Sequence, residues 1–342
     1  MSDRTTRRWL SMFSAALLFQ ANASPIPATP VKSLHPDMQQ IVAADAKLEI
    51  LAEGFQWAEG PVAEPGSGDI LFSDVPANKV WRYREKTGVS LYLSPSGYTA
   101  LDSQPNLKQG ANGLIFNAKG QLVLAQHGDR RLAILQKSSD PQPSYQTLIS
   151  HYQQQPFNSP NDVVQHSDHS YFFTDPPYGL KDADKSAQKQ LSFNGVYHLD
   201  NKGQVKLISQ ALTRPNGLAL SPDEQWLYVA NSDPAAAQWW KFAVDGSHPP
   251  RLFFDATAAA AVQPGLPDGL KVLPSGHLLA TGPGGVWIFN ADGRHLGTIE
   301  TGVAAANVAL SLDRKFLYIT ASSYLLRIPL LTTVAAKTES IQ

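Results

Sequence analysis

Six short segments of the sequence begin with a side chain that can offer an oxygen atom to a cation. These first residues, two carboxylates and four amides, are Glu59, Asn112, Asn161, Asn216, Asp268 and Asn307. Oxygen ligands at this density suit Ca²⁺, and less often Mg²⁺ or Mn²⁺. Zn²⁺ prefers histidine or cysteine, and neither residue occupies these starts. If the fold gathers the six residues, the chemistry they favour is the binding of one divalent cation.

Most of these residues, taken singly, also have a structural explanation. The Asn-Gly pairs that begin at Asn112 and Asn216, and the Asp-Gly pair at Asp268, are good turn formers. Glu59 is different, because glutamate forms turns poorly and this one stands in an otherwise uncharged stretch. A buried carboxylate there needs a partner. The cation hypothesis therefore depends on the common register of the six segments more than on any one dipeptide.

Each segment continues with a short apolar stretch, a polar turn and a second apolar stretch. The second stretches are Ile70–Phe72, Leu122–Leu124, Tyr171–Phe173, Trp226–Val229, His277–Ala280 and Phe316–Ile319. Short apolar runs separated by turn residues indicate strands and hairpins. A β-repeat of roughly 40–50 residues is typical of a propeller blade. The sequence therefore predicts an all-β fold, a six-bladed β-propeller with four-stranded antiparallel blades.

The ring must close, because an open sheet leaves unpaired edges. The strand-like stretch from Lys47 to Leu51 is expected to complete the last blade. A single propeller domain over residues 43–332 follows, with residues 333–342 as a C-terminal tail. Two β-sandwiches are the alternative, and the regular spacing of the segments argues against them.

The N-terminal residues have the pattern of an export signal. Arg4, Arg7 and Arg8 precede an apolar run from Trp9 to Phe19, which is too short to span a bilayer, and small residues follow at 21–23. Residues 1–23 are therefore interpreted as a bacterial signal peptide, with a faint twin-arginine pattern. Residues 24–42, rich in proline, are expected to be a flexible leader. Periplasmic or secreted localisation follows, with no membrane span in the mature chain.

Composition excludes several classes of function. The chain of 342 residues has a formal net charge of -1, which gives no basic surface for nucleic acid. It has no cysteine, which excludes disulfides, thiolate metal sites and a cysteine nucleophile. No Gly-x-Ser-x-Gly elbow supports a serine hydrolase. Nothing in the sequence indicates the oligomeric state.

Several motifs resemble one known family. "EGPV", "DVPANKVWRY", "NSPNDVV", "FTDPPYGL", "RPNGLALSPDEQWLYVANSD", "PDGLKV" and "TGPGGVWIF" occur in this order. As a set they resemble the SMP-30/gluconolactonase/luciferin-regenerating family of six-bladed propellers, and its bacterial gluconolactonases in particular. The resemblance covers roughly Gly54 to Pro329.

The resemblance implies one divalent cation in the central channel, usually Ca²⁺, with Mg²⁺, Mn²⁺ or Zn²⁺ as alternatives. Its ligands would be Glu59, Asn161, Asn216 and Asp268. Asp162 would lie beside the site and orient a ligand or a water molecule. The alternative is that Asp162 is simply a carboxylate in a surface turn.

The family also implies hydrolysis of a lactone ring, with sugar aldonolactones such as gluconolactone as the substrate class. A cation polarises the lactone carbonyl, and a carboxylate activates water. Asp268 is the candidate for that carboxylate, assisted by Asp162. Asp268 could instead attack the carbonyl directly or serve only as a ligand, and the sequence does not separate these roles.

Four residues are expected to bind substrate: Asn112, His127, Asn161 and Tyr178. His127 could contact a substrate hydroxyl or relay a proton, or could simply be a hydrogen-bonded loop residue. Tyr178 could stack on a sugar ring or hydrogen-bond to it. Two other functions remain open. One is hydrolysis of aryl esters or organophosphates at the same metal site, and the other is ligand binding without catalysis.

Overall fold

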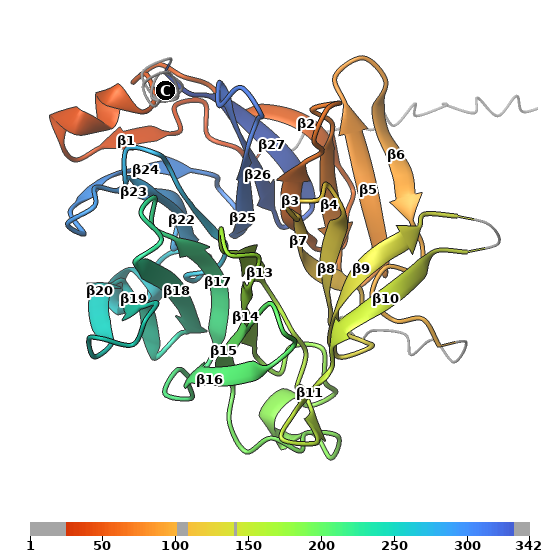
Figure 1. Ribbon diagram of the computed structural model, residues 1–342. Coiled ribbons are helices and arrows are strands. Elements are labelled where there is room, and N and C mark those ends of the chain that lie inside the picture. The colour runs from red at the N-terminus through yellow and green to blue at the C-terminus, as the bar shows by residue number, and fades with distance from the viewer. Residues whose placement is uncertain (1–24, 101–108, 140–141, 332–342) are drawn as a thin grey trace, which may run out of the picture.

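The computed structural model describes residues 25–100, 109–139 and 142–331. Within these ranges the chain is almost entirely β-structure, arranged as six blades around a central channel (Figure 1). Each blade has four antiparallel strands in chain order, except that the last blade takes its outermost strand from the N-terminal part of the chain. The predicted six-bladed β-propeller is confirmed. The proposed signal peptide and the C-terminal tail lie outside the described residues.

The strands of the first three blades, from the channel outward, are β3 (Ala58–Ala63), β4 (Ile70–Asp74), β5 (Lys79–Arg84) and β6 (Gly88–Leu93), then β7 (Ala111–Phe116), β8 (Leu122–Gln126), β9 (Arg131–Lys137) and β10 (Ser144–Ile149), then β13 (Val163–Gln165), β14 (Tyr171–Asp175), β15 (Gly195–Leu199) and β16 (Val205–Ser209). Those of the last three are β17 (Pro215–Leu220), β18 (Trp226–Asp233), β19 (Ala236–Ala243) and β20 (Arg251–Asp255), then β21 (Leu270–Val272), β22 (Leu278–Gly282), β23 (Gly285–Phe289) and β24 (His295–Glu300), then β25 (Ala305–Leu310), β26 (Phe316–Ala321), β27 (Tyr324–Pro329) and β2 (Glu49–Glu53).

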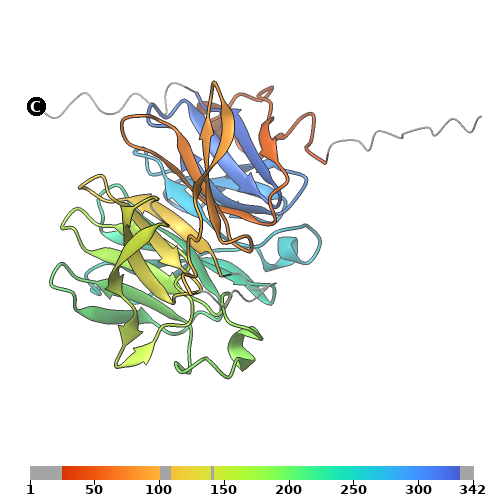
Figure 2. The ribbon, with the colours of Figure 1, turned by 90° about the vertical axis from the view of Figure 1, so that its right-hand side faces the viewer.

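Ring closure occurs where the sequence predicts it. Strand β2 pairs with β27, with Glu49 opposite Arg327. The Arg327 guanidinium contacts Glu49 at 2.6 Å and reaches Glu85 of the first blade at 2.6 Å. In Figure 2 the orange N-terminal strands lie beside the blue C-terminal strands. An ion pair of this kind contributes little by itself, and strand pairing supplies most of the closure.

The N-terminal segment differs from the expected flexible leader. Within residues 24–42, β1 (Val31–Ser33) pairs with β24 and adds a fifth strand to the fifth blade. The 3₁₀-helix η1 (Pro36–Gln40) follows, and its Met38 is fully buried among apolar side chains of the last two blades. The prolines limit regular structure to these short pieces, but Met38 supplies the apolar contact that fixes the segment.

The core consists of apolar layers between neighbouring blades. Strand β14 shows why, since all five of its residues are buried. Successive side chains of a strand point to opposite faces. Phe172 therefore packs with Leu218 and Val229 of the fourth blade. Phe173 packs with Val123 of the second blade on the other side. This two-sided burial makes the middle strands read as continuous apolar runs.

The remaining elements are short. They are the hairpin β11 (His151–Tyr152) and β12 (Gln155–Pro156), the 3₁₀-helix η2 (Ala183–Lys185) and the helix α1 (Thr257–Ala260). None of the helices in the described ranges is long and apolar enough to cross a membrane.

One mouth of the channel gathers two kinds of loop. In a four-stranded antiparallel blade, the connection to the first strand and the loop between the second and third strands lie at the same end. In five blades the latter loop is short: residues 75–78, 127–130, 234–235, 283–284 and 322–323. In the third blade it extends over residues 176–194. A loop of this length between adjacent strands is usually functional.

The packing of η1 gives a test of the N-terminal segment. Met38→Ala should lower the free energy of unfolding by about 2–5 kcal/mol, because it removes a fully buried side chain and leaves a cavity. Guanidinium denaturation measures this change. Leu34→Ala, at a position that is 67% exposed in the same segment, is the control and should change it by less than about 0.5 kcal/mol. Equal effects of the two substitutions would show that the segment is not packed in solution.

Candidate functional site

A cavity of about 300 Å³ lies at the mouth of the channel where these loops meet. Its lining residues are Trp57, Glu59, Val75, Asn112, His127, Asn161, Tyr178, Asn216, Ser232, Gly265, Leu266, Asp268, Ala304 and Ala305. The structure therefore brings together the four predicted metal ligands and the predicted substrate-binding residues. Two predicted residues, Asp162 and Asn307, do not line the cavity.

The ligand candidates occupy one ring of equivalent positions at the start of the innermost strands. Backbone contacts define this ring: the N–H of Gly113 donates to the carbonyl of Asn161, and the N–H of Gly269 donates to that of Ala306. Ala306 therefore holds the sixth position of the ring, and Asn307 lies one residue further along. The prediction that Asn307 belongs to the ring is wrong by one residue. The same one-residue bulge occurs at this place in β3, β7 and β17, so the difference lies in the sequence, which has Ala306-Asn307 where the fourth blade has Asn216-Gly217.

A second ring lies directly below the first. Four of its positions are glycine, and the other two are Asp162 and Asn307, which face each other from the third and sixth blades. The two are equivalent, because each side chain accepts the N–H of the following valine, at 2.9 Å and 2.8 Å. A Cβ atom on Gly113 would lie 2.5 Å from the Asp162 carboxylate, and one on Gly269 would lie 2.0 Å from the Asn307 side chain. The glycines thus leave room for two polar side chains beneath the cavity.

The Glu59 carboxyl group of the cavity wall is strongly perturbed. Its pKa is raised to about 7, chiefly by burial, and the nearby Asp162 carboxylate acts in the same direction. Hydrogen bonds from the Gly60 N–H at 3.0 Å, from Asn307 at 3.4 Å and from Trp57 act in the opposite direction. Burial also raises the pKa of Asp162, and Lys271 partly offsets this effect. Both carboxyl groups are therefore harder to ionise than exposed ones.

The composition of the wall fits a divalent cation. Two carboxylates, Glu59 and Asp268, face a cavity whose lining contains no lysine or arginine. The buried Glu59 carboxylate is costly to ionise, and a cation bound by oxygen ligands would offset that cost. The described residues include no group of three or more His, Cys, Asp or Glu side chains suited to a metal. A site here has to be a mixed set of carboxylate and amide oxygens, which suits Ca²⁺ better than Zn²⁺.

Two of the predicted substrate-binding residues, His127 and Tyr178, line the cavity outside the ring. His127 follows strand β8 and is buried, with its Nε2 atom 3.5 Å from the Asn161 amide nitrogen. Tyr178 is carried into the cavity by the long loop of the third blade. Burial raises the pKa of Tyr178, and Asp268 raises it further, whereas hydrogen bonding to Ser232 and Asn216 acts in the opposite direction. Tyr178 is therefore a neutral phenol at neutral pH, close to two of the ligand candidates.

Several lining residues were not predicted from the sequence. Trp57 stands two residues before Glu59, and the alternation of side chains along an extended chain could have identified it. In three blades, the last residue of the second strand that pairs with the first strand is polar: Asp74, Gln126 and Asn231. In each case the next residue lines the cavity: Val75, His127 and Ser232. This repeated position is a signal that could have identified Ser232. Leu266, Ala304 and Ala305 form an apolar side of the wall and carry no such signal.

The chain is similar to known proteins over most of its length. A family model described as the SMP-30/Gluconolactonase/LRE-like region matches residues 57–323. A gluconolactonase of Zymomonas mobilis is 35% identical over 312 residues, which cover 87% of this chain and 85% of that protein. The solved structure of a gluconolactonase from Xanthomonas campestris has a TM-score of 0.76 at 31% identity and covers 90% of this chain and 97% of that chain. A regucalcin from Agrobacterium tumefaciens, described as a calcium-binding protein, has a TM-score of 0.63 at 16% identity, with coverages of 82% and 93%, and shows the fold.

The raised pKa of Glu59 predicts how stability depends on pH in a chelating buffer. The pKa rises from 4.5 for an exposed glutamate to about 7 in the folded state. The contribution of Glu59 is therefore fully present below pH 4.5 and is lost as the pH rises through 7, by up to about 3 kcal/mol. Buried Asp175, with a pKa raised to about 7, acts in the same direction. Glu59→Gln should leave stability at pH 4.5 unchanged and raise it at pH 8. If the free energy of unfolding of the two proteins changes with pH in parallel, the raised pKa of Glu59 is contradicted.

Proposed function

Because the chain belongs to the SMP-30/gluconolactonase/LRE-like family, we propose that it hydrolyses the ring ester of a sugar aldonolactone with the help of one divalent cation, Ca²⁺. Its enzyme class, a hydrolase of carboxylic esters, follows from that relationship. The observation that carries the finer proposal is the meeting of Glu59, Asn161, Asn216 and Asp268 at one buried cavity.

The proposed ligands, Glu59, Asn161, Asn216 and Asp268, would hold the cation through their side-chain oxygens. A bound cation supplies positive charge that stabilises the oxyanion formed when water attacks the lactone carbonyl. The second ring supports this arrangement, because Asn307 contacts Glu59 and the glycines allow the innermost strands to approach closely. The name of the regucalcin relative supports calcium as the metal. Mg²⁺, Mn²⁺ and Zn²⁺ are the alternatives.

Asp268 is the proposed general base. It lies in the cavity wall, and its charge acts on the neighbouring Tyr178 hydroxyl. A carboxylate in this position accepts a proton from the attacking water and returns one to the alkoxide that leaves when the ring opens. The product is the open-chain hydroxy acid, so that one water molecule is consumed. Asp162 lies below the cavity wall, and its proposed role is limited to supporting the ring from beneath.

The upper wall is suited to a small polyhydroxylated ring. Asn112, His127 and Tyr178 offer amide, imidazole and phenol groups to hydroxyls on one side. Trp57 and Leu266 offer apolar surface, against which the C–H faces of a sugar ring pack. Few polar groups placed against an apolar wall are typical of small-molecule sites.

A pH-drop assay with gluconolactone tests the function. We expect acid release above the spontaneous rate, its loss in EDTA, and its recovery on adding Ca²⁺. Turnover that is unaffected by EDTA would contradict the role of the cation. Turnover of nitrophenyl esters without any lactone would support the aryl esterase alternative. A melting temperature that responds to Ca²⁺, with no turnover of any ester, would support a binding protein.

Substitution of Asp268 tests its catalytic role. Asp268→Asn keeps an oxygen for the cation but removes the base, so kcat should fall by about 10²–10⁴-fold with a folded propeller. Circular dichroism checks the fold. Asp292→Asn, in an exposed turn of the same blade, is the control and should keep the wild-type rate. A rate for Asp268→Asn within a few-fold of wild type would mean that Asp268 is a ligand only.

We also propose that the protein is exported. The basic residues, the apolar run and the small residues at 21–23 support cleavage after Ala23. Cell fractionation with N-terminal sequencing tests this: protein in the periplasm or medium that begins at Ser24 would support export, and protein found only in the cytoplasm with residues 1–23 intact would contradict it.

A further inference from the structure

Three of the four ligand-bearing segments are held in the same way by a polar side chain of the second strand. Asp74 accepts the N–H of Trp57 at 3.1 Å, just before Glu59. Asp175 accepts the N–H groups of Asn158 and Ser159 at 2.8 Å and 2.7 Å, just before Asn161. Asn231 accepts the N–H of Arg214 at 2.8 Å, just before Asn216. Each segment is therefore fixed within its own blade.

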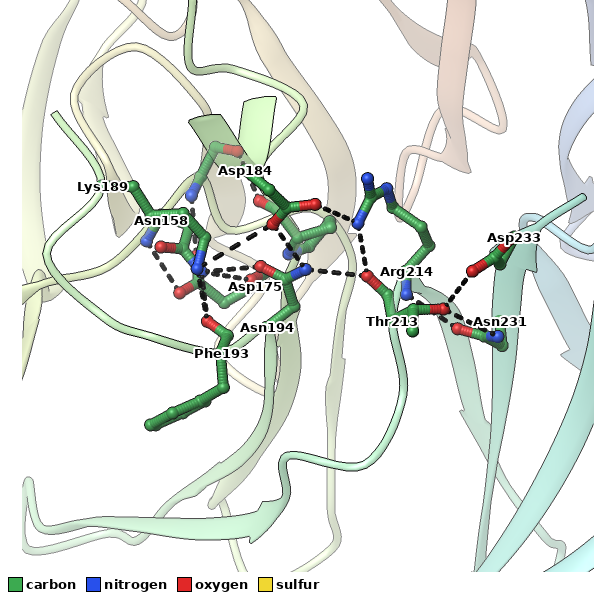
Figure 3. Close-up of polar contacts among 12 residues, drawn as sticks. Asn158, Asp175, Asp184, Lys189, Phe193, Asn194, Thr213, Arg214, Asn231 and Asp233 are labelled. Atoms are coloured by element: carbon green, nitrogen blue, oxygen red, sulfur yellow. Dashed lines mark hydrogen bonds and ion pairs between the residues drawn. The ribbon is translucent and has the colours of Figure 1, made fainter. Parts of the chain in front are cut away.

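Asn194 joins two of these segments across the boundary between the third and fourth blades (Figure 3). Its side-chain oxygen accepts the Asn158 amide at 3.2 Å. Its side-chain nitrogen donates to the Thr213 carbonyl at 2.7 Å and to Asp184 at 3.1 Å. Asn194 is almost fully buried, so these partners replace water. One amide thus connects the approach to Asn161 with the approach to Asn216.

The long loop of residues 176–194 is fastened around this amide. Asp184 forms an ion pair with Arg214 of the next blade. On the other side, Arg130 of the second blade donates to the Gln188 carbonyl at 3.0 Å. The loop is also tied to the Asn161 segment, because the Gly179 N–H donates to the Ser159 hydroxyl at 2.9 Å. The loop therefore spans three blades and fixes the place of Tyr178 in the cavity.

We propose that Asn194 is a positioning residue whose amide sets the separation between the segments bearing Asn161 and Asn216 and so presets the cation site. This inference rests on the proposed function, since it assigns those two amides to the cation. Asn194 touches neither the cation nor the substrate, and it acts through backbone geometry. The loop length, the burial of Asn194 and its bonds to two blades carry the argument. Outer partners of metal ligands commonly affect affinity by about 10–100-fold.

Asn194→Ala tests this in two independent measurements. In metal-free protein, hydrogen exchange followed by mass spectrometry should become faster in residues 157–161 and 212–216 together. In calorimetry with CaCl₂, the Kd should rise by about 10–100-fold. With gluconolactone, saturating Ca²⁺ should restore kcat, because Asn194 does not contact the reacting atoms. Unchanged exchange in residues 212–216, or a Kd within twofold of wild type, would overturn the proposal.

Two further variants make the result specific. Asn201→Ala, at an exposed position of the same blade, should match wild type in both measurements. Asp184→Ala removes a partly exposed ion pair and leaves the bond from Asn194 to Thr213, so it should speed exchange in residues 212–216 alone. If wild-type protein gives no heat with CaCl₂, the proposed cation fails, and the exchange measurement still decides whether Asn194 links the two segments. Faster exchange in residues 157–161 only would show that it does not.

Discussion

The site depends on the cost of ionising the buried Glu59 carboxylate in a cavity whose lining also carries Asp268 and contains no lysine or arginine. Glu59 and Asp268 face this cavity together, and Asp162 lies directly below. Without a counter-ion, burial shifts Glu59 toward its protonated form. Such an arrangement persists only if the surrounding fold holds it in place and if a ligand compensates the charge. The proposed divalent cation would provide this compensation, and the propeller provides the frame.

The frame works because blade symmetry creates layers of equivalent positions. The upper ring presents side chains with oxygen atoms at five of its six positions, with Ala306 at the sixth. The lower ring is glycine except for Asp162 and Asn307, whose side chains fill the space that the glycines leave. Outside the rings, polar residues of the second strands and the Asn194 amide fix the approaches to the ligands. Precision at the site thus comes from repeated backbone geometry, supplemented by a few buried side chains.

The sequence predicts much of this, because repeated segments carry their register with them. The blade count, the closing strand and the meeting of Glu59, Asn161, Asn216 and Asp268 all follow from aligned repeats. Asn307 was misplaced because its segment has Ala306-Asn307 where the fourth and fifth blades have Asn216-Gly217 and Asp268-Gly269, so that the amide follows the ring position instead of occupying it. The N-terminal segment was expected to be flexible because its sequence is rich in proline. The burial of Met38 depends instead on side chains far along the chain. The bonds of Asn194 to two blades likewise arise only after the ring has closed.

The most direct test is an anomalous-scattering map from crystals grown with abundant Ca²⁺. The account predicts one strong peak at the mouth of the channel, with Glu59, Asn161, Asn216 and Asp268 oxygens at about 2.3–2.6 Å. An empty channel at full diffraction quality, or a peak held by other residues, would contradict it.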